Sequence, residues 1–417
     1  MARGKSSKPE TPIADDLRGL GRLAIDGVTG ITGLVEAMHA AVAHLPAVMG
    51  KPAPAITTGV AGFVYRRVRG VTRLVGVGVD ASLSKLAPLL GGSDLSPKRD
   101  AIVAAANGVL GDHLQASGNP LAIRMQLRRD GRALPLTKKH LAARLPEASG
   151  KLLVLVHGLC MNDLQWNHAG HDHGQALARD LGYTPVYLHY NSGRHVSSNG
   201  HDFSQLLEKL AKAWPVPLEQ ITLLCHSMGA LVARSALGDA FSNDLGWSKV
   251  PIQVIFLGTP HHGAPLERAG SWADLLIGMS PYSAPFVRLG KIRSAGIQDL
   301  RHGNLRDSDW QDRDGNGLAD GRTPMALPRK LRAYAIAVSS QASKEESNTH
   351  TQGSDGLVPV ASALGQHKNR EFDLRIPKTR QWVGYGINHL EMLGSDVVYK
   401  RISTWLRNPG KDSDAES

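Results

Sequence analysis

The sequence predicts an α/β protein: a mostly parallel sheet flanked by helices, with a helical region before it and a long insertion within it. Three observations predict this. Short apolar runs alternate with helix-forming segments over much of the chain. One of these runs passes directly into a helix-forming segment at Ser227. About 70 residues separate the run that ends near Leu257 from the run that starts near Leu331, and a simple connection needs only a few.

The first part of the chain is expected to be helical and separate from the sheet. Residues 1–16 form a basic tail that we expect to be flexible, and residues 17–118 form an amphipathic helical region. Its two apolar stripes, over 17–45 and 60–90, advance by steps of three and four residues, so each marks one face of a helix. Prolines and glycines at 46–54 separate the two helices.

The basic charge of the chain is concentrated in its front third. The formal net charge is +11, and residues 1–150 carry 20 Lys and Arg against 11 Asp and Glu. Three interpretations of the helices stay open: a hairpin packed on the following domain, a membrane-surface element whose basic residues meet lipid headgroups, or a coil that binds a partner. No nucleic-acid partner is expected, because the basic clusters lack interleaved aromatics and a known binding motif.

Composition and cysteine usage indicate a large globular protein of a reducing compartment. Hydrophobic residues make up 42% of 417 positions, enough for a sizeable core. The N-terminus has no secretory signal, and no apolar run reaches the length of about 18 residues that spans a membrane. The two cysteines, Cys160 and Cys225, give no disulfide framework and are expected to be small buried thiols. We therefore expect a cytoplasmic protein, either free or peripheral at a membrane.

The elements of the predicted sheet follow in order after a short helix at 98–116. Asp130-Gly131, between alternating residues of 122–136, signals a tight hairpin. Helices are expected at Ser204–Trp214 and Ala230–Leu237. The remaining strands are expected at 151–156, 184–190, 220–225, 251–257, 331–338 and 381–385.

A nucleophile elbow is predicted at Cys225-His226-Ser227-Met228-Gly229, where a strand turns sharply into a helix and exposes one side chain. The pattern is G-x-S-x-G with a cysteine in place of the first glycine, and cysteine is small enough for the close packing of such a turn. The following helix would offer free N–H groups to a developing anion. Ser227 is therefore the candidate nucleophile.

A serine hydroxyl needs a histidine base and a carboxylate that orients the base. In this architecture the carboxylate and then the histidine follow the serine along the chain. Asp355 lies in a turn after the strand predicted at 331–338, and His389 follows the last predicted strand. They are the candidates for the triad. The alternative is that Asp355 only stabilises a turn and His389 only caps the last helix.

Acyl transfer also needs two backbone N–H groups that point at the tetrahedral oxyanion. Met228 supplies the first. The second is expected from Leu159, because the strand at 151–156 runs into His157-Gly158 and glycine lets the backbone turn its amides inward. His157 is expected to brace this loop and not to belong to the triad.

These segments resemble those of α/β-hydrolases of the lipase and esterase type, nearest to bacterial triacylglycerol lipases and GPI inositol deacylase-like hydrolases. The matching pieces are V-H-G-L, C-H-S-M-G, L-G-T-P-H-H-G-A-P, S-D-G-L-V-P and N-H, within a span of about 121 to 407. The resemblance implies the α/β-hydrolase fold, ester substrates and oxyanion donors at Leu159 and Met228. It implies no chemical role for His261 or His262, whose segment shapes the substrate cleft in such families.

The insertion, at about 262–330, is expected to form a lid or cap over Ser227, and an ordinary packed helical excursion is the alternative. Its apolar residues, which could shelter an acyl chain, are Trp272, Leu275, Leu276, Ile277, Met279, Tyr282 and Phe286. Asn191 to Arg194 could also line the cleft. With this insertion, the hydrolase domain is predicted over 119–407, and a flexible tail follows at 408–417.

Two segments have features of metal sites. Asp312–Asp320 matches the first nine positions of a calcium loop. Thr323 stands where a bidentate Glu is expected, so a solvated turn is the alternative. His168, His171 and His173 are irregularly spaced, which favours a hydrogen-bonding cluster over zinc. No cofactor is expected to be required.

The sequence thus predicts a serine hydrolase that cleaves carboxylic esters, of lipid or other apolar acyl groups, through an acyl-enzyme. Thioester cleavage and acyl transfer use the same machinery and stay open. The non-enzymatic alternative is a lipid-surface or scaffold protein on the same fold, in which the basic helices carry the function.

Overall fold

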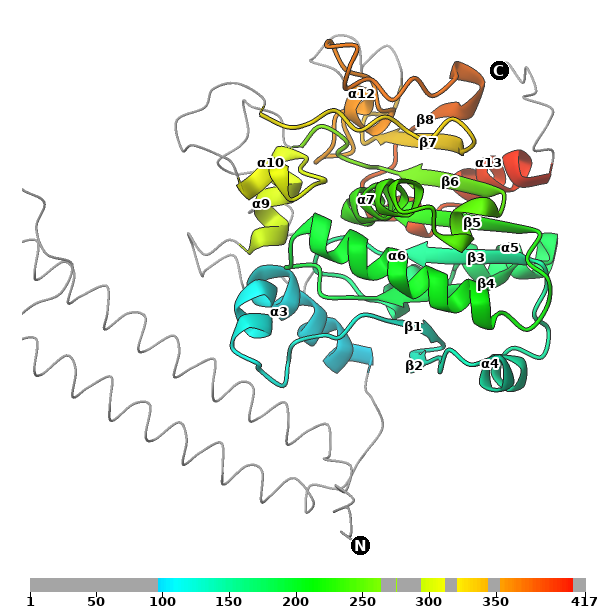
Figure 1. Cartoon of the computed structure of the whole chain (residues 1–417). Coiled ribbons are helices and arrows are strands. Elements are labelled where there is room, and N and C mark those ends of the chain that lie inside the picture. The colour runs from blue at the N-terminus through cyan, green and yellow to red at the C-terminus, as the bar shows by residue number, and fades with distance from the viewer. Residues whose placement is uncertain (1–96, 264–274, 276–293, 312–320, 344–352, 408–417) are drawn as a thin grey trace, which may run out of the picture. The chain divides into compact units, whose positions relative to one another are not determined.

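A computed structural model describes much of the chain beyond residue 96 (Figure 1). The described residues are 97–263, 275, 294–311, 321–343 and 353–407. The predicted N-terminal tail, both amphipathic helices, most of the lid, the calcium loop and the C-terminal tail lie outside them. Pro97–Gln115 belong with Ile123 onward to one compact unit, and residues 116–122 belong to another. The predicted domain boundaries stay predictions.

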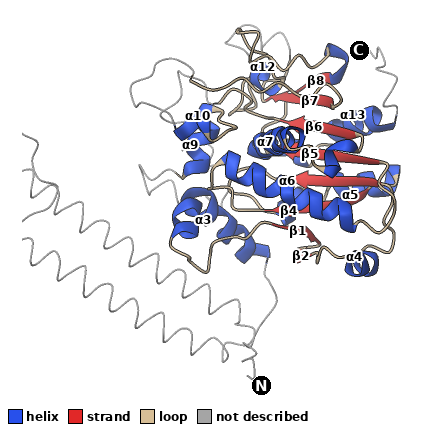
Figure 2. Cartoon of the chain, viewed as in Figure 1, coloured by secondary structure: helices blue, strands red, loops and turns tan. Residues whose placement is uncertain are grey.

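An eight-stranded sheet forms the centre of the larger unit, with helices on its two faces (Figure 2). Its strands are β1 (Gln126–Arg129), β2 (Arg132–Ala133), β3 (Lys151–Val156), β4 (Thr184–His189), β5 (Gln220–His226), β6 (Ile252–Leu257), β7 (Arg332–Ser339) and β8 (Gln381–Tyr385). Their spatial order is β2-β1-β4-β3-β5-β6-β7-β8. β3 to β8 pair in parallel, and β1 pairs antiparallel with β2 and β4. This mostly parallel sheet confirms the predicted α/β-hydrolase fold class.

The helices cover both faces of the sheet, with α6 and α7 on one face and α5 and α13 on the other (Figure 1). The helices are α3 (Pro97–Ala116), α4 (Lys138–Arg144), α5 (His173–Leu181), α6 (Val196–Ala213), α7 (Met228–Ser242), α9 (Ala295–His302), α10 (Ser308–Gln311), α12 (Val360–Ala363) and α13 (Asp396–Arg407). Short 3-10 turns lie at Asp163–Trp166, Gly246–Lys249, Lys378–Arg380 and Glu391–Leu393. Within these described segments, no helix is long and apolar enough to cross a membrane.

The strands form where the sequence has continuous apolar runs, because a parallel sheet covered on both faces buries both sides of each strand. In β3, every residue from Leu152 to Val156 is fully buried. Alternate residues face the layer of α5 and α13. That core includes Leu153, Leu155, Leu177, Leu224, Ile255, Tyr334, Ile336, Val398 and Ile402.

The predicted hairpin is confirmed between β1 and β2. Asp130 has φ 51° and Gly131 has φ 72°, the left-handed pair that a two-residue turn requires to match the twist of its strands. The side chain of Arg128 in β1 pairs with Asp100 of α3 at 2.9 Å and with Asp163 at 3.2 Å. These buried ion pairs hold α3 on the edge of the sheet.

One predicted helix begins much earlier than expected. The sequence predicts it at Ser204–Trp214, and α6 begins at Val196. The first turns contain serine, asparagine and Gly200, which are poor helix formers. A Cβ at Gly200 would lie 2.3 Å from Ser235 Oγ, so the glycine is needed where α6 packs closely against α7.

Candidate active site

Ser227 occupies a strained turn between β5 and α7. Its backbone has φ 52° and ψ −124°, a conformation that non-glycine residues adopt only where the surroundings impose it. Its N–H donates to the carbonyl of Leu257 at 2.9 Å. A Cβ at Gly229 would lie 2.4 Å from the carbonyl oxygen of Val156. The small residue therefore lets α7 start directly against the end of β3, as the elbow interpretation requires.

Asp355 and His389 lie together in the structure. His389 Nδ1 is 2.7 Å from Asp355 Oδ2, and both side chains are almost completely buried. The other carboxylate oxygen accepts hydrogen bonds from the amides of Leu357 (2.9 Å) and Val358 (2.7 Å). Because Nδ1 faces a carboxylate, it carries the proton of the neutral ring, and Nε2 is left as the basic nitrogen.

His389 lies, like Ser227, at the carboxyl ends of the parallel strands. Leu257 accepts the Ser227 N–H, and a Cβ on the next residue, Gly258, would lie 3.2 Å from His389 Cε1. Within the described part of the chain, His389 Nε2 is buried without a hydrogen-bond partner. No hydrogen bond joins it to Ser227 there, and in unliganded sites such bonds are often long until substrate binds.

The loop after β3 brings the predicted oxyanion donors to the elbow. A Cβ at Gly158 would lie 3.1 Å from Ser227 Cβ, so this loop packs directly against the serine. Among the described residues, neither the Leu159 N–H nor the Met228 N–H has an acceptor. Met228 is the first residue of α7, where the helix leaves its N–H groups free.

The cysteines are both buried thiols, as predicted. Cys160 follows Leu159 with φ 59°, and its N–H donates to Ser192 Oγ at 3.1 Å. Burial raises the pKa of the Cys160 thiol to about 12 and that of Cys225 well above its usual value. Neither forms a thiolate near neutral pH, so neither has the reactivity of a nucleophile.

His157 supports the loop. Its Nδ1 lies 2.9 Å from the carbonyl of Gly158, and its ring stacks on Tyr190 with centroids 4.4 Å apart. The Tyr190 hydroxyl donates to the His157 carbonyl at 2.9 Å. Burial lowers the pKa of His157 to about 3, so the ring is neutral.

His226 is a site residue to which sequence reasoning assigned no role. Its Nε2 lies 3.1 Å from the carbonyl of His389, and the two rings lie 4.7 Å apart. Since a carbonyl only accepts, Nε2 must be the protonated nitrogen. Burial, together with the neighbouring His389, holds the pKa of His226 well below its usual value. Its position next to Ser227 in the elbow is the only sequence feature that marks His226 as a site residue. The sequence does not show that its ring contacts the His389 carbonyl.

The histidines of two further segments, 168–173 and 261–262, contact other groups of the described structure. His171 Nε2 lies 2.9 Å from His173 Nδ1, and His173 Nε2 lies 2.9 Å from the Met392 carbonyl, which makes them a hydrogen-bonding cluster. In the described ranges, no group of three or more His, Cys, Asp or Glu residues could hold a metal ion. His261 Nδ1 lies 3.3 Å from the guanidinium of the buried Arg234.

The polar segment after β4, which the sequence predicts could line the cleft, makes hydrogen bonds to neighbouring parts of the chain. Asn191 donates to the Gly111 carbonyl of α3 at 2.8 Å, and Ser192 accepts from Cys160. Arg194 pairs with Asp202 at 2.6 Å. These contacts connect the loop after β3 with α3 and α6.

Comparisons with solved structures find similarity to esterases and a phospholipase at low identity. No family model and no curated protein sequence matches the chain. Among solved structures, esterase Pf2001 of Pyrococcus furiosus is 14% identical, with 63% of this chain and 82% of that chain covered and a TM-score of 0.36. An esterase of Pyrobaculum calidifontis is 13% identical, with 62% and 75% covered and a TM-score of 0.37. Phospholipase PlaB of Legionella pneumophila is 18% identical, with 51% and 45% covered and a TM-score of 0.34. Because these identities and TM-scores are low, the fold assignment depends on the strand order of the sheet and on the elbow at Ser227.

Proposed function

We propose that this chain is a serine hydrolase that cleaves carboxylic esters of apolar acyl groups, with Ser227 as nucleophile, His389 as general base and Asp355 as the carboxylate that orients it. The observation that carries the proposal is the buried contact of 2.7 Å between Asp355 and His389, beside a serine in a strained elbow. This is the arrangement that activates a serine hydroxyl.

The reaction proceeds in two half-reactions. Ser227 Oγ attacks the ester carbonyl carbon while His389 Nε2 takes the hydroxyl proton. The tetrahedral intermediate then expels the alcohol, which receives that proton. Water attacks the resulting acyl-enzyme with His389 again as base, which releases the carboxylic acid and restores Ser227.

Charge is stabilised at two places during each half-reaction. The amides of Leu159 and Met228 donate to the oxyanion, and one such donor contributes about 2.7 to 4 kcal/mol in a comparable hydrolase. The Asp355 carboxylate stabilises the imidazolium of His389. Because Asp355 and His389 are 2% and 1% exposed, little water screens this interaction.

Apolar acyl esters are the proposed substrate class for two reasons. The sequence motifs resemble those of lipases and esterases, and the insertion carries an apolar stretch between residues 272 and 286. Thioesters are the nearest alternative, because the same nucleophile and oxyanion donors accept them.

The test measures hydrolysis of short- and long-chain p-nitrophenyl esters and of matched acyl thioesters by the wild type and Ser227→Ala. Fluorophosphonate labelling read by mass spectrometry locates the nucleophile. The expected result is a label on Ser227, turnover that is lost in Ser227→Ala, and a preference for esters. Ser242→Ala, at the exposed end of the same helix, is the matched control and should retain activity.

Two outcomes would count against the proposal. Turnover that persists in Ser227→Ala would place the chemistry elsewhere. Absence of both labelling and turnover, with or without calcium or detergent, would favour the lipid-surface or scaffold interpretation.

A further inference from the structure

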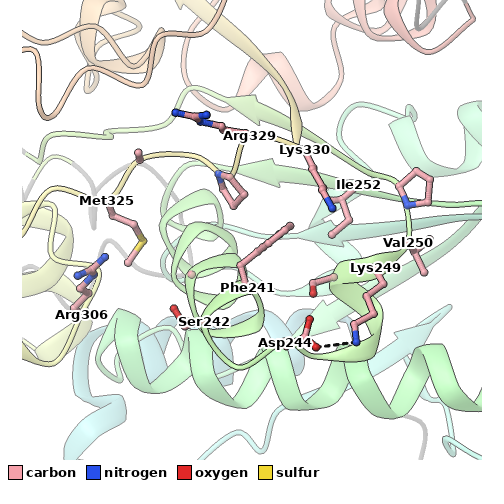
Figure 3. A pocket seen from close by; sticks show the side chains of 15 residues that line it. Phe241, Ser242, Asp244, Lys249, Val250, Ile252, Arg306, Met325, Arg329 and Lys330 are labelled. Atoms are coloured by element: carbon pink, nitrogen blue, oxygen red, sulfur yellow. Dashed lines mark hydrogen bonds and ion pairs between the residues drawn. The ribbon is translucent and has the colours of Figure 1, made fainter.

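A cavity lies at the end of the sheet opposite the candidate triad, and Figure 3 shows the side chains that line it. It lies between the end of α7, the start of β6 at Ile252, and residues 325–330, which lead into β7. Ser227, Asp355 and His389 follow the opposite, carboxyl ends of their strands. Since a six-residue strand such as β6 is about 20 Å long, a ligand here would leave the triad accessible.

The size of the cavity suits a small organic molecule. Its volume is about 820 Å³, and small-molecule sites typically have about 300 to 1,000 Å³. Apolar side chains form much of its wall: Pro251 and Ala326 are exposed, and the other five are half-buried or buried. These five are Phe241, Val250, Ile252, Met325 and Pro328.

The rim of the cavity is strongly basic. Lys249 is paired with Asp244 at 2.9 Å. Arg306, Arg329 and Lys330 are exposed, and none has an acidic partner among the residues that the structure describes. Figure 3 shows the Lys330 side chain extending from the rim toward Ile252.

We propose that this cavity binds a single-chain amphiphile with a carboxylate head group. The alkyl chain lies against Phe241, Ile252 and Met325, and the head group lies at the basic rim, at Lys330. Arg329, whose side chain points away from Ile252 in Figure 3, adds positive charge to the same rim. An inorganic anion would leave the apolar wall in water, and an uncharged hydrocarbon would leave the cations without a counter-charge. The choice of a carboxylate rests on the proposed function, because an ester hydrolase releases acids of this class, whereas the binding of an anionic amphiphile follows from the cavity alone.

The experiment measures the binding of submicellar dodecanoate to the full chain by calorimetry. A diazirine-bearing dodecanoate, crosslinked and read by mass spectrometry, locates the site. We expect crosslinks in residues 238–252 and 325–330. Each added methylene of a chain-length series should tighten binding by up to about fourfold, because it buries more apolar surface.

Matched variants test the head group. Arg329→Gln/Lys330→Gln should weaken dodecanoate binding by about fivefold, the upper range for an exposed ion pair. Lys138→Gln/Lys139→Gln, which removes the same charge from the exposed α4, should bind dodecanoate like the wild type. Dodecanol should bind more weakly than dodecanoate to the wild type.

Several results would overturn the proposal: equal binding of dodecanol and dodecanoate, equal weakening by the two double variants, or crosslinks confined to other segments such as those around Ser227. Tighter binding of dodecyl phosphate than of dodecanoate would overturn the choice of a carboxylate. Binding is measured without turnover, so Ser227→Ala should bind normally here. Failure of the ester assays and failure of this site are therefore distinguishable.

Discussion

At the scale of single residues, the Asp355 carboxylate is fixed through both of its oxygens. Oδ1 accepts from the amides of Leu357 and Val358, and Oδ2 contacts His389 Nδ1. All of these partners donate hydrogen bonds, so this position suits an ionised carboxylate, whose oxygens only accept them. An amide in this position must turn its NH₂ group toward a donor.

Asp355→Asn should therefore lower kcat by about 10³- to 10⁴-fold with little change in KM, because the amide favours the wrong tautomer of His389. Steady-state kinetics with a p-nitrophenyl ester would measure this. Asp202→Asn, which changes an exposed carboxylate paired with Arg194, is the control. A decrease in kcat of less than tenfold in Asp355→Asn would remove Asp355 from the triad.

His226→Gln tests whether this residue positions His389. Loss of the 3.1 Å contact with the His389 carbonyl should misplace the base and lower kcat by about ten- to a hundredfold, with KM nearly unchanged. His201→Gln, at an exposed position on α6, should leave both constants unchanged. If KM rose and kcat stayed constant, His226 would act on substrate binding and not on His389.

At the scale of elements, the junction of α7 with β3 decides whether the elbow can form. A Cβ at Gly229 would lie 2.4 Å from the Val156 carbonyl and 2.5 Å from that of His157. Both atoms are backbone, so neither can move aside alone. The close packing of the start of α7 against the loop after β3 thus depends on the absence of a side chain at Gly229.

Gly229→Ala should lower both stability and activity, because α7 must shift away from the loop that carries Leu159. We expect a loss of about 1 to 3 kcal/mol in the free energy of unfolding, the usual cost of overpacking. Chemical denaturation, together with ester hydrolysis, would measure both effects. Gly321→Ala is the matched control, because a Cβ there meets nothing within 4 Å. Unchanged activity in Gly229→Ala would mean that the elbow tolerates a displaced helix.

At the scale of the whole molecule, buried histidines make stability depend on pH. Burial is the main cause that lowers the pKa of each from the usual 6.5. The five are His157 (to about 3), His173 (to about 4), His262 (to about 3), His226 and His261. Below pH 6.5 the unfolded chain binds protons that the folded chain excludes, so stability falls as pH falls through this window.

We expect the free energy of unfolding to decrease as pH falls from 6.5 to 5, with a slope that approaches about 1.4 kcal/mol per pH unit for each imidazole that stays neutral in the folded state. His173→Gln should reduce this slope by about 1.4 kcal/mol per pH unit, which corresponds to one bound proton. Denaturant unfolding at several pH values would measure the slopes. His140→Gln, at an exposed position, should not change the slope; equal slopes for the wild type and His173→Gln would contradict the assignment.

Contact of the N-terminal helices with a membrane surface stays a prediction. Because α3 packs on the sheet through Arg128 and Asp100, a truncated chain should begin at Pro97 and not near Asn119. The full chain is expected to float with anionic vesicles and the truncated chain is not. Equal flotation of both would exclude anchoring by residues 1–96.

The sequence by itself determined the elements that depend on local patterns. Apolar runs marked each parallel strand, because both faces of the sheet are covered, and Asp130-Gly131 marked the hairpin, because few residues adopt left-handed backbone twice in succession. The order of Ser227, Asp355 and His389 along the chain was enough to select three residues, and the structure brings Asp355 and His389 into contact.

Only the tertiary structure decided the rest. The contact of His226 with the His389 carbonyl joins residues 163 positions apart, and no local pattern encodes such a distance. α6 begins at Val196, despite its poor helix formers, because Gly200 allows α7 to approach. The basic cavity of Phe241, Ile252, Arg329 and Lys330 joins a helix end, a strand start and a loop, and the sequence alone cannot place these side by side.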